Sequence, residues 1–88
     1  MNAAFTVDIF TPEAAALQTE ATYLSVQAPD GGFGLLRGHL PCVIALVAGD
    51  IVLTLPDGGK KTCRCSDGFL EMRDNRAEIF VNTCEEVR

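Results

Sequence analysis

The sequence is poor in basic residues and lacks the features of secreted and membrane-spanning proteins. Only seven of its 88 residues are Lys or Arg against twelve Asp or Glu, so the formal net charge is −5 and the isoelectric point about 4.6. Nucleic acids and anionic membrane surfaces attract clustered basic residues, which excludes both as direct partners and leaves a basic protein surface. Residues 1–5 contain neither a basic segment nor a long apolar one, so we expect no signal peptide. The most apolar stretch, residues 40–48, is far shorter than the ~20 residues of a membrane-spanning helix.

Cys-x-x-Cys pairs, the usual source of zinc ligands, are also missing. Four cysteines are present, and the closest two are Cys63 and Cys65, which are separated by a single residue. An even number of cysteines indicates disulfides mainly in secreted chains, a context this sequence does not show. Residues two apart in a strand point to the same face, and an unpaired cysteine packs as a small apolar residue. We therefore expect buried free thiols in a reducing compartment, with a metal or redox site and disulfides as the alternatives.

No stretch has the 3.6-residue period of a long amphipathic helix, whereas a period of two recurs along the chain. In residues 4–10, Phe5, Val7 and Ile9 alternate with polar neighbours. The pattern predicts further strands at 22–27, 51–55, 60–66, 68–72 and 76–82, and a strand buried on both faces at 42–47. Two less regular pieces are predicted, a short strand or irregular link at 14–17 and a brief apolar piece at 33–36. Turn residues predict turns at 29–32, 56–59 and 73–75. The polar tail, 83–88, is given no element. Many short strands separated by turns indicate an all-β sandwich or barrel in one domain, residues 1–88.

The residues offer little chemistry. A single histidine, His39, rules out a multi-histidine metal site, and a loop histidine more often makes a structural or interface hydrogen bond than acts as a general base. The glycine-rich segment 30–34 is not followed by Lys-Ser/Thr or by a helix pattern, so we interpret it as a flexible loop rather than a phosphate site. No catalytic, cofactor-binding or metal-binding residue is predicted, and the residues alone indicate a binding module.

Two motifs resemble one known family. Residues 30–41 read Asp-Gly-Gly-Phe-Gly-Leu-Leu-Arg-Gly-His-Leu-Pro. This stretch is similar to the Gly-x-x-Gly-(Ile/Leu)-x-x-Gly-His-x-Pro signature of the epsilon subunit of bacterial and chloroplast ATP synthases. Residues 66–75, Ser-Asp-Gly-Phe-Leu-Glu-Met-Arg-Asp-Asn, resemble that family's Ser-Gly-Gly-(Phe/Ile)-Leu-Glu-Val-x-x-Asn, and residues 5–12 resemble its first strand. The resemblance covers nearly the whole chain.

The resemblance implies a flattened β-sandwich of two mostly antiparallel sheets with about ten short strands. It implies a non-catalytic central-stalk subunit that binds gamma and the c-ring and couples ion-driven rotation to ATP synthesis. Such a subunit lies at the cytoplasmic face of the bacterial inner membrane as a peripheral protein and needs no cofactor. The positions that correspond to the family's contacts are Asp30, Gly31, Gly32 and Phe33 for the c-ring, and Thr11, His39 and Ile44 for gamma.

The sequence also departs from the family. Gly32 stands where many members have an acidic residue, which leaves Asp30 as the carboxylate of that loop, and Arg37 stands in place of a common Pro. Typical members continue into a helical hairpin that inhibits ATP hydrolysis and in some cases binds ATP. Because no such pattern occurs before Arg88, we expect neither an inhibitory switch nor nucleotide binding in these residues.

Three interpretations remain open at this stage. Phe33, Leu35 and Leu36 form either an exposed apolar strip suited to an interface or part of the core. The protein is alternatively an unrelated β-sandwich binding module. A third reading is a small metalloprotein that uses His39 with Cys63 and Cys65.

Overall fold

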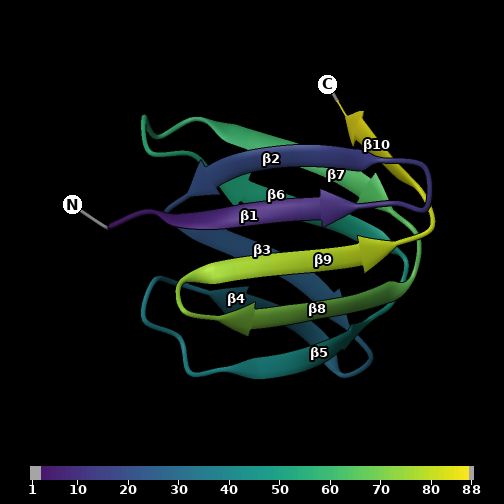
Figure 1. Cartoon of the computed structure of the whole chain (residues 1–88), viewed down its shortest axis with the longest axis horizontal. Coiled ribbons are helices and arrows are strands. Elements are labelled where there is room, and N and C mark those ends of the chain that lie inside the picture. The colour runs from purple at the N-terminus through teal and green to yellow at the C-terminus, as the bar shows by residue number, and fades with distance from the viewer. Residues whose placement is uncertain (1–2, 88) are drawn as a thin grey trace.

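Ten strands form two stacked sheets of five strands each (Figure 1), as a computed structural model that describes residues 3–87 shows. The strands are β1 (Phe5–Phe10), β2 (Ala15–Ala21), β3 (Tyr23–Ala28), β4 (Gly31–Leu35), β5 (Cys42–Leu46), β6 (Gly49–Thr54), β7 (Lys60–Cys65), β8 (Gly68–Arg73), β9 (Arg76–Val81) and β10 (Cys84–Val87). Sheet A has the order β2-β1-β9-β8-β5 and sheet B the order β10-β7-β6-β3-β4. Every pairing is antiparallel except that of β1 with β9. The predicted sandwich is confirmed.

The period-two alternation of the strands builds the core between the sheets. On β1, Phe5, Val7 and Ile9 point inward and are at most 2% exposed. Across sheet A the register places Ile9 beside Ile79, and Ile79 beside Leu70, so that apolar side chains form continuous rows on the inner face. Burying an aliphatic side chain of this size stabilises the fold by roughly 1.5–3 kcal/mol. The two sheets are therefore held together mainly by these inner rows.

The hairpin turns follow the predicted positions. Asp74 and Asn75 link β8 to β9 with φ of 52° and 59°, as in a type I′ turn, whose twist suits a two-residue hairpin. In the β6–β7 hairpin, the backbone N–H of Gly59 donates to the carboxylate of Asp57 over 2.8 Å. Local turn chemistry therefore sets both connections.

Two expectations about strands were wrong. β5 was predicted to be buried on both faces, but its residues alternate and Val43 is 69% exposed. The reason is that β5 is the last strand of sheet A, so only its inner face is covered. The tail was given no element, yet Cys84–Val87 form β10, which pairs with β7. Its polar Cys-Glu-Glu-Val sequence resembles a tail because β10 is also an edge strand.

Smaller differences concern β2, β4 and the apolar strip. β2 extends from Ala15 to Ala21 because it pairs with β1 along its whole length, well beyond the short link predicted at 14–17. β4 begins at Gly31, inside the predicted loop, because it pairs with β3. Leu35 is fully buried in the core, whereas Phe33 and Leu36 are 38% and 47% exposed. The predicted exposed strip therefore keeps only these last two residues.

Candidate docking face

The outer face of sheet A carries a row of stacked aromatic rings, here called the aromatic rung. It consists of Phe10 on β1, Phe80 on β9 and Phe69 on β8, and Ala45 on β5 continues it. The ring centroids of Phe10 and Phe80 lie 5.3 Å apart and those of Phe80 and Phe69 lie 5.0 Å apart, with the planes tilted by 21° and 23°. Phe69 is 47% exposed. A row of large apolar side chains on the solvent side of a sheet is typical of a surface that a partner covers.

A shallow groove of about 440 Å³ lies along one end of this rung. The three phenylalanines line it together with Thr11 and Pro12, which follow β1, and with Gly68 at the start of β8. A Cβ atom at Gly68 would collide with the backbone carbonyl of Phe80, so glycine lets the two strands approach here. The backbone N–H of Thr11 donates to the carbonyl of Ala14 over 2.9 Å, which fixes the chain at the groove wall.

Charged residues form two further rows beside the aromatic rung. One step along the strands, Asp8, Glu78 and Glu71 lie directly opposite one another. One step further, Arg76 and Arg73 are opposite each other. Like charges directly opposite in a sheet are destabilising. A partner surface that presents charges of the opposite sign would relieve this repulsion.

Among the described residues, one ion pair joins the acidic row to the basic row and neutralises one charge of each. Asp8 is 4% exposed, and its carboxylate accepts a hydrogen bond from the guanidinium of Arg76 over 2.9 Å. The described residues show no ion pair for Glu71 or Glu78. The outer face of sheet A is therefore striped, with an aromatic, an acidic and a basic row at successive positions about 7 Å apart.

His39 lies in the loop between β4 and β5. Its ring packs edge-on against Phe33, with the centroids 5.7 Å apart. Two hydrogen bonds attach the loop to sheet A: the N–H of Gly38 donates to Asn75 over 2.7 Å, and Arg37 donates to the carbonyl of Ala4 over 2.8 Å. The loop is therefore held by the side chain of Asn75 and by the main chain of Ala4.

The geometry of His39 also bears on catalysis. Its Nδ1 lies 2.8 Å from the carbonyl oxygen of Leu40, and a carbonyl can only accept, so Nδ1 carries the proton. The Cys42 sulfur lies 3.8 Å from the same nitrogen, which therefore cannot take the thiol proton. Burial raises the pKa of the Cys42 thiol above its ordinary 9.0, which further disfavours the thiolate. The pair is not an activated nucleophile.

The seven residues that the family resemblance predicts, four for the c-ring and three for gamma, are spread over the β3–β4 hairpin, the β4–β5 loop and sheet A. Asp30, Gly31 and Gly32 are exposed at the tip of the β3–β4 hairpin. Phe33, predicted with them for the c-ring, contacts His39, which was predicted for gamma.

The remaining two predicted residues belong to sheet A or its margin. Thr11 lies in the groove beside the aromatic rung. Ile44 is half-buried and packs against the core, so its exposed neighbours Val43 and Ala45 present the outer face of β5. Sequence reasoning missed the aromatic rung altogether. Its only sequence signal is a phenylalanine at an outward position in each of three strands.

The metalloprotein reading required His39 to meet Cys63 and Cys65. The cysteines lie on β7, three strand spacings from β4 in sheet B, or about 14 Å, and His39 lies in the loop beyond β4. No group of three or more His, Cys, Asp or Glu suited to a metal occurs among residues 3–87. The fold thus keeps the proposed ligands apart.

Residues 4–87 match the family model described as the β-sandwich domain of the ATP synthase delta/epsilon chain. The ATP synthase epsilon chain of Chlorobaculum tepidum is 35% identical over 78 residues, which cover 89% of this chain and 89% of the relative. The epsilon chain of Staphylococcus saprophyticus is 35% identical over 80 residues, which cover 90% of this chain but only 59% of the relative. This chain thus spans most of the first relative and less than two thirds of the second.

Solved structures show the same fold. A chain in the mitochondrial ATP synthase of Euglena gracilis superposes with a TM-score of 0.89 at 20% identity, covering 98% of this chain and 55% of that one. A chain from the central stalk and c-ring structure of the Tetrahymena thermophila mitochondrial enzyme gives a TM-score of 0.72 at 15% identity, covering 90% and 63%.

Proposed function

The chain belongs to the ATP synthase delta/epsilon family, and on that premise we propose that it is the central-stalk subunit that couples rotation of the ion-driven c-ring to ATP synthesis. Epsilon chains are non-catalytic subunits of the complex. Membership of this family removes the alternative of an unrelated binding module. Within residues 3–87 no helix is long and apolar enough to cross a membrane. The subunit would lie at the cytoplasmic face of the bacterial inner membrane, attached through its partners.

Gamma docks, in this proposal, on the outer face of sheet A. The observation that carries the assignment is the aromatic rung with its adjoining groove, which holds Thr11 in its wall. Large aromatic side chains at the centre of an interface supply much of its binding energy. The acidic row beside the rung favours basic side chains on gamma, which would orient the partner and speed association.

The c-ring meets the tip of the β3–β4 hairpin. Asp30 is exposed there and gives the tip one negative charge, while Gly31 and Gly32 leave its backbone open to a polar loop. The hairpin belongs to sheet B and the aromatic rung to the outside of sheet A, so both partners can be bound at once. A close-packed two-sheet core between them deforms little and is suited to transmitting torque.

The test is binding of this chain to an ATP synthase catalytic head that contains gamma and has been stripped of its own epsilon subunit. Saturable one-to-one binding is expected. Ala45→Arg, which places a bulky cation at the exposed end of the aromatic rung, should weaken binding at least tenfold, because a buried unpaired charge costs several kcal/mol.

Glu85→Arg is the matched control. Glu85 is exposed on β10 in sheet B, and its replacement changes the charge by more than Ala45→Arg does. It should leave binding within about twofold, since exposed charges distant from an interface have small effects. Absence of binding by the folded chain, or an equal loss in both variants, would refute docking on this face.

A further inference from the structure

Three of the four cysteines converge where β10 joins β7. Cys84 on β10 lies directly opposite Cys65 on β7, and Cys63 is the next residue on the same inward face of β7. Cys63 and Cys65 are 2% and 5% exposed. Cys84 is half-buried and packs against the core, so it is the member of the group that a small reagent reaches first.

The hydrogen bonds around Cys65 and Cys84 define the spacing of this pair. The backbone N–H of Ser66 donates to the carbonyl of Thr83 over 3.1 Å. Ser66 and Thr83 are the residues next to Cys65 and Cys84, so the neighbouring pair carries the hydrogen bond and Cys65 and Cys84 form a non-hydrogen-bonded pair. In such a pair the Cα atoms lie about 4.5 Å apart. Disulfides form at Cα separations of roughly 4.4–6.8 Å, so the backbone already satisfies the requirement for a cross-strand bond.

We propose that Cys65 and Cys84 are a redox-sensitive pair that closes into a disulfide by exchange with a small disulfide of the glutathione class. The Cys84 thiolate attacks one sulfur of the small disulfide and releases one small thiolate, which leaves a mixed disulfide on Cys84. Cys65 loses its proton to solvent and attacks the Cys84 sulfur, and the second small thiolate departs. Two cysteine thiols are thereby oxidised and one small disulfide is reduced to two thiols.

Burial makes this exchange slow and keeps it ordered. It raises the pKa of Cys63 to about 11 and that of Cys65 to about 12 from an ordinary 9.0, with the neighbouring Cys84 adding to both shifts. At neutral pH both buried thiols stay protonated, so neither attacks a small disulfide directly. Cys65 reacts once a mixed disulfide stands directly opposite it, whereas Cys63 faces Glu86 and is only a diagonal neighbour of Cys84.

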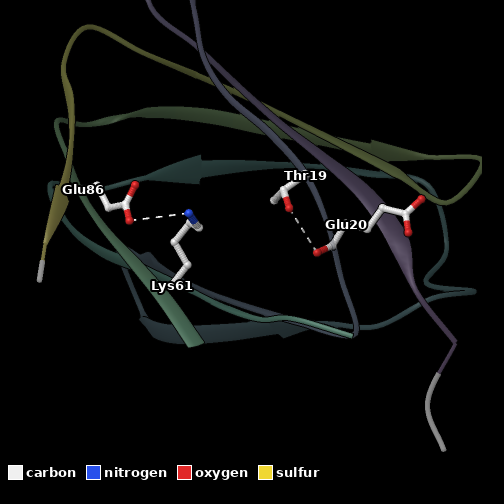
Figure 2. A network of polar contacts seen from close by, with 4 residues as sticks. All are labelled: Thr19, Glu20, Lys61 and Glu86. Atoms are coloured by element: carbon white, nitrogen blue, oxygen red, sulfur yellow. Dashed lines mark hydrogen bonds and ion pairs between the residues drawn. The ribbon is translucent and has the colours of Figure 1, made fainter. Parts of the chain in front are cut away.

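The bond would fasten a strand that is otherwise weakly held. β10 pairs with β7 alone, at the edge of sheet B. Among the described residues, the ion pair of Glu86 on β10 with Lys61 on β7 is 3.5 Å long and partly exposed (Figure 2), and exposed pairs of this kind contribute little. Closing a loop of about 20 residues should slow amide hydrogen exchange in β10 by about 100-fold where exchange occurs by detachment of the strand.

The experiment exposes the folded chain to oxidised glutathione, alkylates the remaining thiols and measures intact mass. The unsubstituted chain and Cys63→Ala are expected to lose two hydrogens at Cys65 and Cys84 and to carry no glutathione on either, with peptide mapping showing the bond between them. Cys65→Ala should instead stop at a glutathione adduct on Cys84, and Cys84→Ser should form no internal bond, with any adduct mapped to the half-buried Cys42 instead. Slowed exchange of the β10 amides, reversed by a dithiol reductant, should accompany the bond.

Cys63→Ala and Cys65→Ala are matched because both remove an equally buried thiol from the same face of β7. Any loss of folding through a small cavity would therefore affect both. A stable glutathione adduct on Cys84 of the unsubstituted folded chain, an internal disulfide in Cys65→Ala, or no oxidation of Cys65 and Cys84 would each overturn the proposal.

Discussion

Replacing Phe69 by alanine tests the docking face with a magnitude that follows from exposure. Burying a whole phenylalanine side chain is worth roughly 1.5–3 kcal/mol. Phe69 is 47% exposed in the free chain, so a partner on the aromatic rung can bury up to about half of it. Losing that contact should cost roughly 0.7–1.5 kcal/mol of binding free energy, which is a rise in Kd of about three- to twelvefold.

The same substitution has a separate effect on stability. It removes the stacking of Phe69 on Phe80, whose centroids are 5.0 Å apart. Such a pair contributes about 0.5–1.5 kcal/mol beyond its buried area. A loss of about 1 kcal/mol lowers the Tm of a domain of this size by roughly 4–8 °C, so binding has to be measured well below the transition.

The assay is a titration of the gamma-containing head with the unsubstituted chain, Phe69→Ala and Val47→Ala. Val47 is similarly exposed, at 42%, but it lies in the link from β5 to β6, outside the aromatic rung. Val47→Ala should change Kd by less than about twofold, because small surface changes away from an interface are nearly neutral. Tight binding by folded Phe69→Ala, or an equal loss in Val47→Ala, would show that gamma does not cover the rung.

Two other outcomes follow from the structure. Asp30→Lys should weaken attachment of the reassembled head to membranes that carry the c-ring, more at low than at high salt. The control Glu85→Lys should leave attachment unchanged. Equal attachment of both variants at low salt would contradict the hairpin contact. Under reducing conditions, the free energy of unfolding should fall as pH rises above about 9, because the unfolded chain releases the thiol protons at an ordinary pKa of 9.0 while the folded chain holds them to about 11 at Cys63 and about 12 at Cys65. Urea unfolding at about pH 8 and about pH 10.5 measures this fall in the free energy of unfolding. The double variant Cys63→Ala/Cys65→Ala should show a smaller fall between the two pH values. A fall as large as that of the unsubstituted chain would refute the assignment to these thiols.

Strand alternation in the sequence predicted which side chains enter the core. Phe5, Val7 and Ile9 could be placed inside because residues two apart share a face of a strand, and Cys63 and Cys65 follow the same rule. The hairpin turn at Asp74 and Asn75 was equally predictable, since residues that tolerate positive φ mark such turns. The motifs around His39 and after Ser66 were sufficient to indicate the family.

Alternation does not say which strands are neighbours, and this accounts for the errors. β5 appeared buried on both faces because its sequence is apolar, and only its place at the edge of sheet A exposes Val43. β10 appeared to be a polar tail because an edge strand needs few apolar residues. The end of a sheet is a property of strand order, which one strand's sequence does not contain.

The sequence by itself therefore determined the fold class, the inward faces of most strands, the main turns and the family. Tertiary structure decided what stands side by side. Phe10 and Phe80 are 70 residues apart in the chain and meet only because β1 pairs in parallel with β9. Cys65 and Cys84 oppose each other only through the register of β10 on β7. The physical reason is that a strand's own residues set the direction of its side chains, whereas hydrogen-bond register between distant strands sets their neighbours.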